Sequence, residues 1–353
     1  MDEKSALFDI RADATGRMVT RRTVMAGASA LVGAATVEAV AQPAATQPFG
    51  SVLPGMTVKP DREAMVPVPG GHVYVRINGD LEGPRPPLVL LHGGPGSSHW
   101  YFLNATAMAG ERAIIMYDQL DSGRSDMPGL TNNWTIARFV EELEAIGAFL
   151  GLKRWHVLGA SCGATIALEY AARRPSQLAG LVLQSPFVST RTWIADAELL
   201  KSRMPPATRD LLDRCDVPGG TTPADCQAAT DAYYARHVHR KSPPPPVAAY
   251  KAALPKSFSD NVYNYMWGRA EFAVSGTLKD YDGTKLLKSL EAKRTLFVAG
   301  EHDEARPPTV RKFAKGVPGG ADFAEIAGAA HLVMNDNPEG YLSVLRPWLA
   351  ARD

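Results

Sequence analysis

The sequence predicts an α/β fold, in which a mostly parallel β-sheet carries helices on both faces and a helical cap is inserted into the chain. Two observations predict this class. From about residue 187 to residue 279 the composition is helical, with proline and glycine breaks and no strand pattern, which indicates the cap. Elsewhere helical stretches alternate with runs that are apolar on both faces, the pattern of parallel strands covered by helices, at 87–91, 113–117, 155–158, 178–183 and 295–299.

The length and the net charge of the chain limit the size of its domains and the kinds of partner that it can bind. With 353 residues, of which 45% are hydrophobic, the chain is long enough for one large α/β domain with an insertion. Its 38 basic and 37 acidic residues give a formal net charge of +1, which argues against a nucleic-acid partner. We expect a small molecule or a short peptide as the binding partner.

The amino-terminal segment 1–41 is similar to a twin-arginine export signal. Arg21-Arg22 precedes a stretch rich in alanine, glycine and valine that ends before Glu38, and residues 39–41 (Ala-Val-Ala) fit a cleavage site. A membrane anchor is the alternative, but a spanning helix needs about 20 strongly apolar residues and this stretch is shorter. We therefore expect an exported, periplasmic or secreted protein without stable membrane insertion after signal removal.

The remaining elements can be placed in chain order. Residues 42–62 are rich in proline, glycine and threonine and predict a linker. Two alternating runs separated by a Pro-Gly-Gly turn then predict a β-hairpin. The sheet domain is expected as two parts, 63–186 and 280–353, on either side of the cap at 187–279. Within them we expect hairpin strands at 64–68 and 72–77, helices at 134–150, 309–315 and 338–349, and a late strand at 322–326.

The run at 155–158 leads into a G-x-S-x-G motif at residues 159–163, with Ser161 at its centre. A helical stretch of small residues follows it, so the motif indicates a nucleophile elbow, a strained strand-to-helix turn that exposes the serine. Glycines are needed on both sides because two backbones pass closely there. The alternative is an ordinary glycine turn with an incidental serine.

An acyl-transfer site also needs a base that takes the serine proton and an acid that orients the base. Asp303 follows the strand at 295–299, and His331 lies in the loop after the next strand. Because His331 is the only histidine after Asp303, the chain order is Ser161, Asp303, His331, as in α/β hydrolases. We predict a nucleophile, an orienting acid and a general base in that order.

The site further needs donors for the developing oxyanion. The loop His92-Gly-Gly-Pro-Gly96 follows an early strand, where this fold supplies one backbone N–H, and we assign that donor to Gly94. The second donor is expected to be the N–H of Cys162. An ordinary glycine turn is the alternative for the loop.

The oxidation state of the three cysteines depends on the compartment in which the protein resides. In an oxidising periplasm, Cys215 and Cys226 flank a turn-rich stretch and can close a small disulfide loop. Cys162 is then left over, and we interpret it as a small buried hydrophobe, with a cysteine nucleophile as the alternative. His237 and His239 suggest a metal pair only weakly, since positions i and i+2 diverge on a helix, and we expect no metal and no cofactor.

The chain resembles the proline iminopeptidase family of α/β hydrolases, and within it the tricorn-interacting aminopeptidases and bacterial amino-acid amidases. The residues that carry the resemblance are the loop 92–96, Asp118-Gln119, the elbow at Ser161 and the segment 300–304. The resemblance implies that a serine attacks the acyl carbonyl while two acidic side chains bind the free α-amino group of the substrate. By position these acids match Glu304 and Glu271. The alternative interpretation of Glu304 is an exposed loop carboxylate, and that of Glu271 is a solvated cap residue or a partner of Arg269.

Two positions depart from the family pattern. Cys162 stands where an aromatic residue is common, and Asp121 stands where glycine is usual. Both are expected near the pocket, so they bear on which acyl group is accepted. The function implied is a serine hydrolase that cleaves the amide bond after a free amino-terminal residue through an acyl-enzyme. The alternatives are an exported esterase or lactonase of the same fold, and a non-catalytic binding protein.

Overall fold

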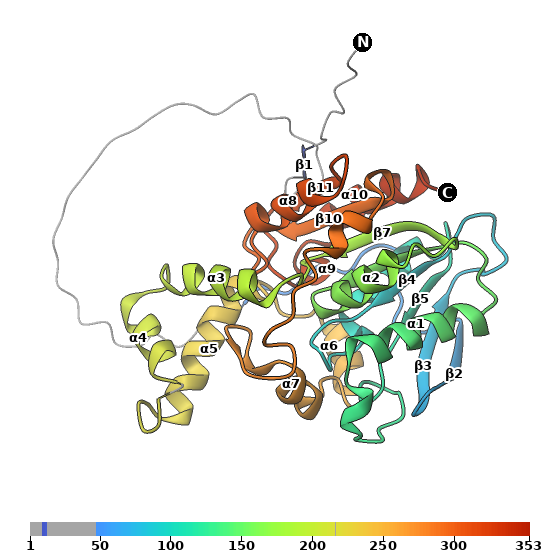
Figure 1. Ribbon diagram of the computed structural model, residues 1–353. Helices are drawn as coiled ribbons and strands as arrows, with labels where there is room; N and C mark the ends of the chain where they lie inside the picture. Colours follow the sequence, from blue (N-terminus) through green and yellow to red (C-terminus); the bar gives the residue numbers. More distant parts are fainter. Residues whose placement is uncertain (1–8, 13–46, 216) are drawn as a thin grey trace, which may run out of the picture.

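The fold is built on one central sheet, as expected. The computed structural model describes residues 9–12, 47–215 and 217–353, so that most of the predicted export signal lies outside the described residues (Figure 1). The strand order is β1-β11-β10-β7-β6-β4-β5-β3-β2, and all pairs are parallel except those that β3 makes with β2 and β5. The strands are β1 (Asp9–Ala12), β2 (Arg62–Val68), β3 (Gly71–Asn78), β4 (Leu88–Leu91), β5 (Ile114–Tyr117), β6 (Trp155–Ala160), β7 (Leu178–Gln184), β10 (Thr295–Gly300) and β11 (Asp322–Ile326).

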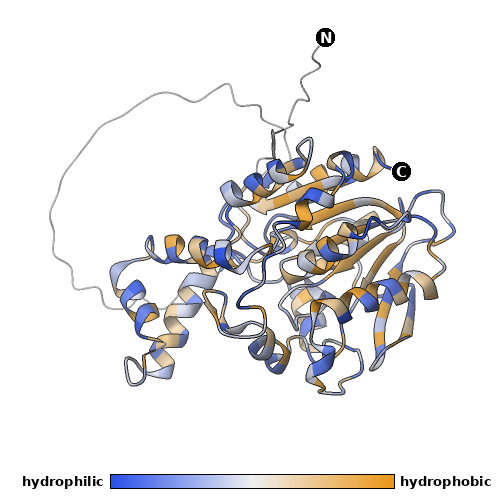
Figure 2. Ribbon diagram, viewed as in Figure 1, coloured by the Kyte–Doolittle hydropathy of each residue, from blue (hydrophilic) through white to orange (hydrophobic). Residues whose placement is uncertain are grey.

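Helices cover both faces of this sheet, because successive strand residues point to opposite sides and nearly all are apolar (Figure 2). In β4, for example, Val89 packs with one buried cluster and Leu90 with the other. One face is covered by α1 (Ile136–Phe149), α2 (Cys162–Ala172) and α8 (Pro307–Gly316). The other face is covered by the 3-10 helix η1 (His99–Met108), α9 (Val333–Asp336) and α10 (Pro338–Ala350).

Local sequence fixes the ends of several helices. The Thr135 side chain accepts a hydrogen bond from the Arg138 N–H and starts α1, and the Asn337 side chain accepts one from the Gly340 N–H and starts α10. Both helices begin within two residues of the expected position. The 3-10 helix η1 was not predicted, because its buried residues surround the helix and leave no periodic pattern.

The inserted segment forms the helical cap, and Figure 1 shows α3, α4 and α5 extending away from the sheet. It has a small core of its own that includes Leu200, Leu212, Tyr233 and Phe272. It also contains a two-stranded sheet, β8 (Gly268–Ala270) and β9 (Ala273–Val274), which is too short to produce a strand pattern in the sequence. The cap helices are α3 (Thr190–Lys201), α4 (Pro206–Arg214), α5 (Pro223–His237), α6 (Pro245–Ala252) and α7 (Asp260–Met266). Two short 3-10 helices, η3 (Leu286–Ser289) and η4 (Ala292–Arg294), follow the cap. A third, η2 (Thr131–Asn133), precedes α1 in the sheet domain.

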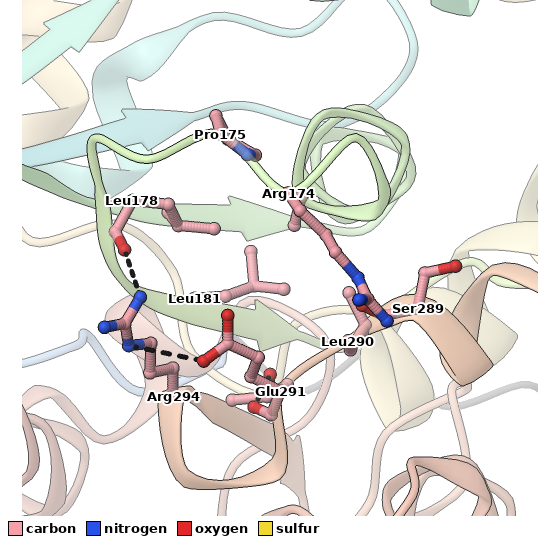
Figure 3. Close-up of a pocket in the computed structure, with 10 residues that line it drawn as sticks. Arg174, Pro175, Leu178, Leu181, Ser289, Leu290, Glu291 and Arg294 are labelled. Atoms are coloured by element: carbon pink, nitrogen blue, oxygen red, sulfur yellow. Dashed lines mark hydrogen bonds and ion pairs between the residues drawn. The ribbon is translucent and has the colours of Figure 1, made fainter.

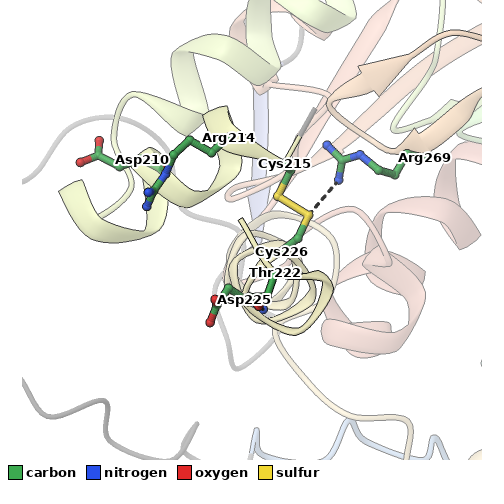
Figure 4. Close-up of a disulfide and its surroundings, with 7 residues drawn as sticks. All are labelled: Asp210, Arg214, Cys215, Thr222, Asp225, Cys226 and Arg269. Carbon is green, nitrogen blue, oxygen red and sulfur yellow. Dashed lines mark hydrogen bonds between the residues drawn. A yellow bond between two sulfur atoms is a disulfide. The ribbon is translucent and has the colours of Figure 1, made fainter. Parts of the chain in front are cut away.

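A disulfide joins Cys215, which follows α4, to Cys226 in the first turns of α5 (Figure 4). The Arg269 side chain donates a hydrogen bond to the Cys226 sulfur at 3.5 Å, so the disulfide also contacts the β8 strand. The third cysteine, Cys162, is buried in the sheet domain. The pairing is the one expected for an oxidising compartment.

Two amino-terminal stretches lie on the body of the protein. Residues 47–61, within the expected linker at 42–62, form no helix and pack on the sheet domain: Leu53 is buried, and its N–H donates to the Asn104 side chain. Strand β1 lies inside the predicted signal and pairs with the edge strand β11. Among the described residues, no helix is long and apolar enough to cross a membrane.

Candidate active site

Ser161 sits at the sharp turn between β6 and α2, with φ of 56° and ψ of −122°. The positive φ is a strained conformation for a residue with a side chain. It is held because the backbones around it are very close: a Cβ on Gly159 would lie 2.1 Å from the Gly163 carbonyl oxygen, and one on Gly163 would lie 2.3 Å from the Leu91 carbonyl oxygen. The two glycines of the motif are therefore sterically required, which is the geometry of a nucleophile elbow.

Asp303 and His331 are brought together by the loops after β10 and β11. His331 Nδ1 lies 2.8 Å from Asp303 Oδ1, and both side chains are buried. The Asp303 carboxylate also accepts hydrogen bonds from the Ser185 hydroxyl at 2.6 Å and from the Ala305 N–H at 2.9 Å. These bonds fix the carboxylate, so that it orients the imidazole and presents Nε2 toward the cavity side.

The electrostatics around His331 favour its protonated form. Burial lowers the pKa of the imidazole, but the charge of Asp303 and the hydrogen bond to it outweigh burial, and the pKa is raised overall. The ring also packs edge-on against Trp193 of the cap, with 5.6 Å between ring centroids. A base with a raised pKa takes the serine proton more readily once it is neutral.

Ser161 and His331 both line one cavity of about 390 Å³. Between these two described side chains no hydrogen bond is formed; in the reaction such a contact has to tighten when substrate binds. The cavity lies between the sheet domain and the cap. Its walls include Gly94, Trp100, Tyr101, Gln184, Tyr234, His239, Lys251, Tyr263, Arg269 and Glu271.

The loop 92–96 lies directly against the elbow. The Gly93 N–H donates to the Tyr101 hydroxyl at 2.6 Å, which leaves the Gly94 N–H as the next donor of the loop at the cavity wall. Gly94 has φ of 111°, which requires glycine. Burial lowers the pKa of His92 to about 4, so its neutral ring accepts from the Gln119 N–H at Nε2 and donates to the Gly93 carbonyl at Nδ1. Thus the Asp118-Gln119 motif holds the loop in place.

Two carboxylates lie beside the Asp303–His331 pair. Glu271 is in the β8–β9 turn, lines the cavity and accepts a hydrogen bond from the Tyr263 hydroxyl at 2.9 Å. Glu304 lies deeper and is not a lining residue; it is 2% exposed, and neither carboxylate oxygen has a hydrogen-bond partner among the described residues. Its Oε1 lies 3.8 Å from His331 Nδ1. The burial of Glu304 does not fit an exposed loop carboxylate. Glu271 is half-buried at the cavity wall, where Arg269 is also a lining residue.

Burial raises the pKa of the Glu304 carboxyl well above its usual range, and the nearby charges of Glu271 and Asp303 raise it further. Burial likewise raises the pKa of Glu271, although His331 and the Tyr263 hydroxyl oppose the shift. A buried carboxylate without a partner is costly unless a cation approaches it. The pair is therefore suited to hold an ammonium group.

The two departures from the family pattern have different surroundings. Asp121 has φ of 64°, a conformation that favours glycine and that aspartate tolerates. Its carboxylate accepts hydrogen bonds from the Trp134 indole at 2.7 Å and the Gly129 N–H at 2.8 Å. Asp121 does not line the cavity described above, although it was expected near the pocket. Cys162 packs in the core behind the elbow, where burial raises its thiol pKa to about 12, as expected for an inert cysteine.

A small notch of about 20 Å³ beside the carboxyl end of α2 is closed by its own side chains (Figure 3). There Arg174 donates to the Ser289 carbonyl, and Arg294 donates to the Leu178 carbonyl and pairs with Glu291. Within residues 9–12, 47–215 and 217–353, no group of three or more His, Cys, Asp or Glu side chains is placed to hold a metal ion.

Sequence reasoning missed several residues of the site. Ser185 follows β7 directly, as Ser161 follows β6, so the rule that functional side chains lie at the carboxyl ends of parallel strands would have found it. Tyr263, Tyr234 and Trp193 come from cap helices, and no local pattern marks them. The Tyr234 hydroxyl accepts a hydrogen bond from the Glu271 N–H at 3.3 Å.

Comparisons with known proteins agree with this geometry. Residues 86–338 match the family described as alpha/beta hydrolase fold. A proline iminopeptidase of Heyndrickxia coagulans is 34% identical over 288 residues, which are 81% of this chain and 98% of that protein. One of Levilactobacillus brevis is 32% identical over 295 residues, 83% of this chain and 97% of that protein.

Solved structures give the same result. The crystal structure of a proline iminopeptidase from Mycobacterium smegmatis is 34% identical, with a TM-score of 0.74, and the match covers 82% of this chain and 98% of that one. The crystal structure of VinJ is 31% identical, with a TM-score of 0.76 and coverage of 84% and 100%.

Proposed function

We propose, from the premise that this chain belongs to the proline iminopeptidase family of α/β hydrolases, that it releases the free amino-terminal residue of short peptides or amino-acid amides through an acyl-enzyme. The family makes the chain a serine hydrolase. The observation that carries the finer proposal is the buried carboxylate of Glu304, which has no hydrogen-bond partner among the described residues and lies next to the Asp303–His331 pair, with Glu271 nearby in the cap. An α-ammonium group is the cation that such a pair would hold.

The proposed reaction begins with the Ser161 hydroxyl. His331 Nε2 takes its proton while the oxygen attacks the acyl carbonyl, and Asp303 stabilises the imidazolium that forms. The N–H groups of Gly94 and Cys162 receive the oxyanion. His331 then protonates the leaving amine, the C–N bond breaks, and the amino acid remains esterified to Ser161. Water, deprotonated by His331, attacks this ester, which releases the amino acid and restores the serine.

The two glutamates set the position of the acyl carbon in this proposal. Each hydrogen bond between the ammonium and a carboxylate contributes about 1.5 to 3 kcal/mol, and both are lost with an N-acylated substrate. Because the ammonium is anchored, the carbonyl next to it is held over Ser161. The enzyme would therefore discriminate against blocked amino termini.

The test compares an amino-acid p-nitroanilide with its N-acetyl counterpart and with a simple p-nitrophenyl ester. We expect kcat/KM for the free-amine anilide to exceed that for the blocked compound by at least about 100-fold, and Glu304→Gln to reduce it by about 10- to 100-fold. Glu301→Gln is the matched control, since Glu301 is exposed in the same loop. Ser161→Ala should abolish all three activities by several orders of magnitude.

Equal rates for the free and the blocked anilide would overturn the aminopeptidase assignment. Preference for the ester, with no effect of Glu304→Gln, would favour the esterase or lactonase alternative. Failure of a fluorophosphonate probe to label Ser161 would favour a non-catalytic binding protein.

We also propose that the protein is exported. The amino-terminal twin-arginine pattern motivates this, and the Cys215–Cys226 disulfide supports it, because disulfides persist in oxidising compartments. The cleavage site expected after Ala41 would leave Gln42 as the first residue of the mature chain.

A further inference from the structure

A cationic side chain lies in the cavity wall without an acidic partner. Lys251, on α6, is half-buried and lines the same cavity as Ser161. Its Nζ lies 4.5 Å from the centroid of the Trp100 ring, a cation–π contact that leaves the N–H groups free to bind an anion. No carboxylate of the described residues forms an ion pair with it, although ion pairs are frequent elsewhere in the chain. A cation held in a cavity without a counter-charge indicates an anionic ligand group.

The position of Lys251 is fixed by its neighbour. The Tyr250 hydroxyl is hydrogen-bonded to His99 Nε2 at 2.7 Å and accepts from Arg76 at 3.2 Å. His99 is in turn paired with the buried Asp118 at 2.7 Å. This network anchors α6 to the sheet domain, so Lys251 projects from a rigid support and not from a loose surface helix.

The cavity wall carries charged groups of both signs, among them Glu271, Arg269 and Lys251. Tyr234 of α5 accepts a hydrogen bond from the Glu271 N–H. His239, just beyond the end of α5, lies near Lys251: burial lowers the pKa of its ring, the positive charge of Lys251 lowers it further, and Asp336 opposes the shift.

We propose that Lys251 binds the terminal carboxylate of the leaving amino acid, so that the preferred substrates are unblocked dipeptides. In an extended dipeptide the ammonium and carboxylate are about 7 Å apart, so both charged groups of one dipeptide can lie in this cavity of about 390 Å³. A longer peptide carries its carboxylate past Lys251, and an amide or an anilide has none. The inference rests on the proposed function, because it takes the ammonium at Glu271 and Glu304 as the first anchor.

The experiment measures kcat/KM for a dipeptide, for the same dipeptide as its carboxamide, and for an amino-acid p-nitroanilide. Each is assayed with the wild type, with Lys251→Met and with Lys256→Met. Lys256 is a matched control, because it follows α6 and does not line the cavity. We expect the wild type and Lys256→Met to prefer the dipeptide over its carboxamide by at least about tenfold, the discrimination expected from one charge-assisted hydrogen bond.

In Lys251→Met the preference for the dipeptide over its carboxamide should fall to within about twofold. Lys251→Arg should restore most of this preference. Restoration by arginine would show that Lys251→Met lost the preference through its missing charge and not through misfolding. A further arm uses a dipeptide carboxamide with aspartate as the second residue. If this compound regains the full preference, the partner of Lys251 is an acidic side chain and the assignment to the terminal carboxylate is wrong.

The outcomes separate this inference from the proposed function. If the wild type hydrolyses the anilide but does not prefer the dipeptide, the inference fails and the proposed function stands. If the anilide and both peptides are inert, the proposed function fails and the inference with it. Retention of the preference in Lys251→Met also overturns the role of Lys251.

Discussion

His331, Glu271 and Glu304 all have raised pKa values, and in the proposed reaction protonation of any of them lowers activity. Protonated His331 cannot accept the serine proton, and a protonated glutamate cannot attract an ammonium. Activity is therefore lost on the acid side by more than one ionisation. On the alkaline side the substrate α-amine loses its charge near its ordinary pKa of about 8.

A pH profile of kcat/KM tests this residue-scale picture. In the wild type we expect an acid limb steeper than one proton, because His331 and the glutamate pair must both lose a proton. Glu304→Gln removes one of these ionisations, so its acid limb should approach a slope of one while the alkaline limb is unchanged. Identical acid limbs in the two enzymes would mean that Glu304 does not ionise during binding.

Four strands position the residues of the site, because each strand ends at the same edge of the sheet. Strands β6, β7, β10 and β11 lead to Ser161, Ser185, Asp303 and His331 respectively. The carboxyl end of α5 then joins two of these loops, since the His237 carbonyl accepts hydrogen bonds from the N–H groups of Glu304 and His331, each at 3.2 Å. The cap is thus bonded directly to the catalytic loops, and movement of α5 would move them.

Helix α1 carries a buried group whose effect on stability can be measured. Glu142 is 2% exposed, one oxygen accepts from the Leu120 N–H at 3.3 Å, and the other has no partner. Burial raises its pKa from 4.5 to about 8. Between these values the folded chain holds a proton that the unfolded chain has released, so the free energy of unfolding falls as pH rises through that window.

We expect Glu142→Gln to remove this loss. From pH 5 to pH 9 the variant should gain stability relative to the wild type by an amount on the order of a few kcal/mol. Denaturant unfolding at several pH values measures it, and Glu144→Gln, on the exposed face of the same helix, is the control. Parallel stability curves for Glu142→Gln and the wild type would show that Glu142 is ionised in the folded state throughout.

The cap and the sheet domain together close one cavity, whose wall carries Glu271 from the β8–β9 turn and Lys251 from α6. The disulfide ties α4 to α5, the helix that lines this cavity. Oxidation of Cys215 and Cys226 therefore belongs to the assembly of the binding site as well as to the stability of the cap. The disulfide therefore links the proposed export to an oxidising compartment with the proposed activity at the cavity.

Export can be tested on the complete chain. We expect replacement of both Arg21 and Arg22 by lysine to retain the protein in the cytoplasm of a bacterium with twin-arginine transport, where thiol alkylation would find Cys215 and Cys226 reduced. Replacement of Arg11 and Arg17 by lysine is the control and should leave the protein exported and oxidised. Unchanged distribution of the Arg21 and Arg22 variant would contradict the signal assignment.

The sheet, the elbow and the chain order of the proposed catalytic side chains could be predicted from the amino-acid sequence. Parallel strands end at one edge, so Ser161, Asp303 and His331 could be placed together from strand positions alone, and the steric need for Gly159 and Gly163 is local. The match of Glu304 and Glu271 to amine-binding acids came from family resemblance, because no local pattern distinguishes them from solvated carboxylates.

Only the tertiary structure decided what those carboxylates and Lys251 face. The β8–β9 turn that carries Glu271 is too short to leave a periodic signal, and the burial of Glu304 depends on packing between the cap and distant loops. Lys251 is an ordinary lysine in the sequence, and its place in the cavity follows from contacts of α6 with η1. Periodicity reports which face of an element is buried, whereas charge complementarity across a cavity arises only when residues far apart in the chain meet.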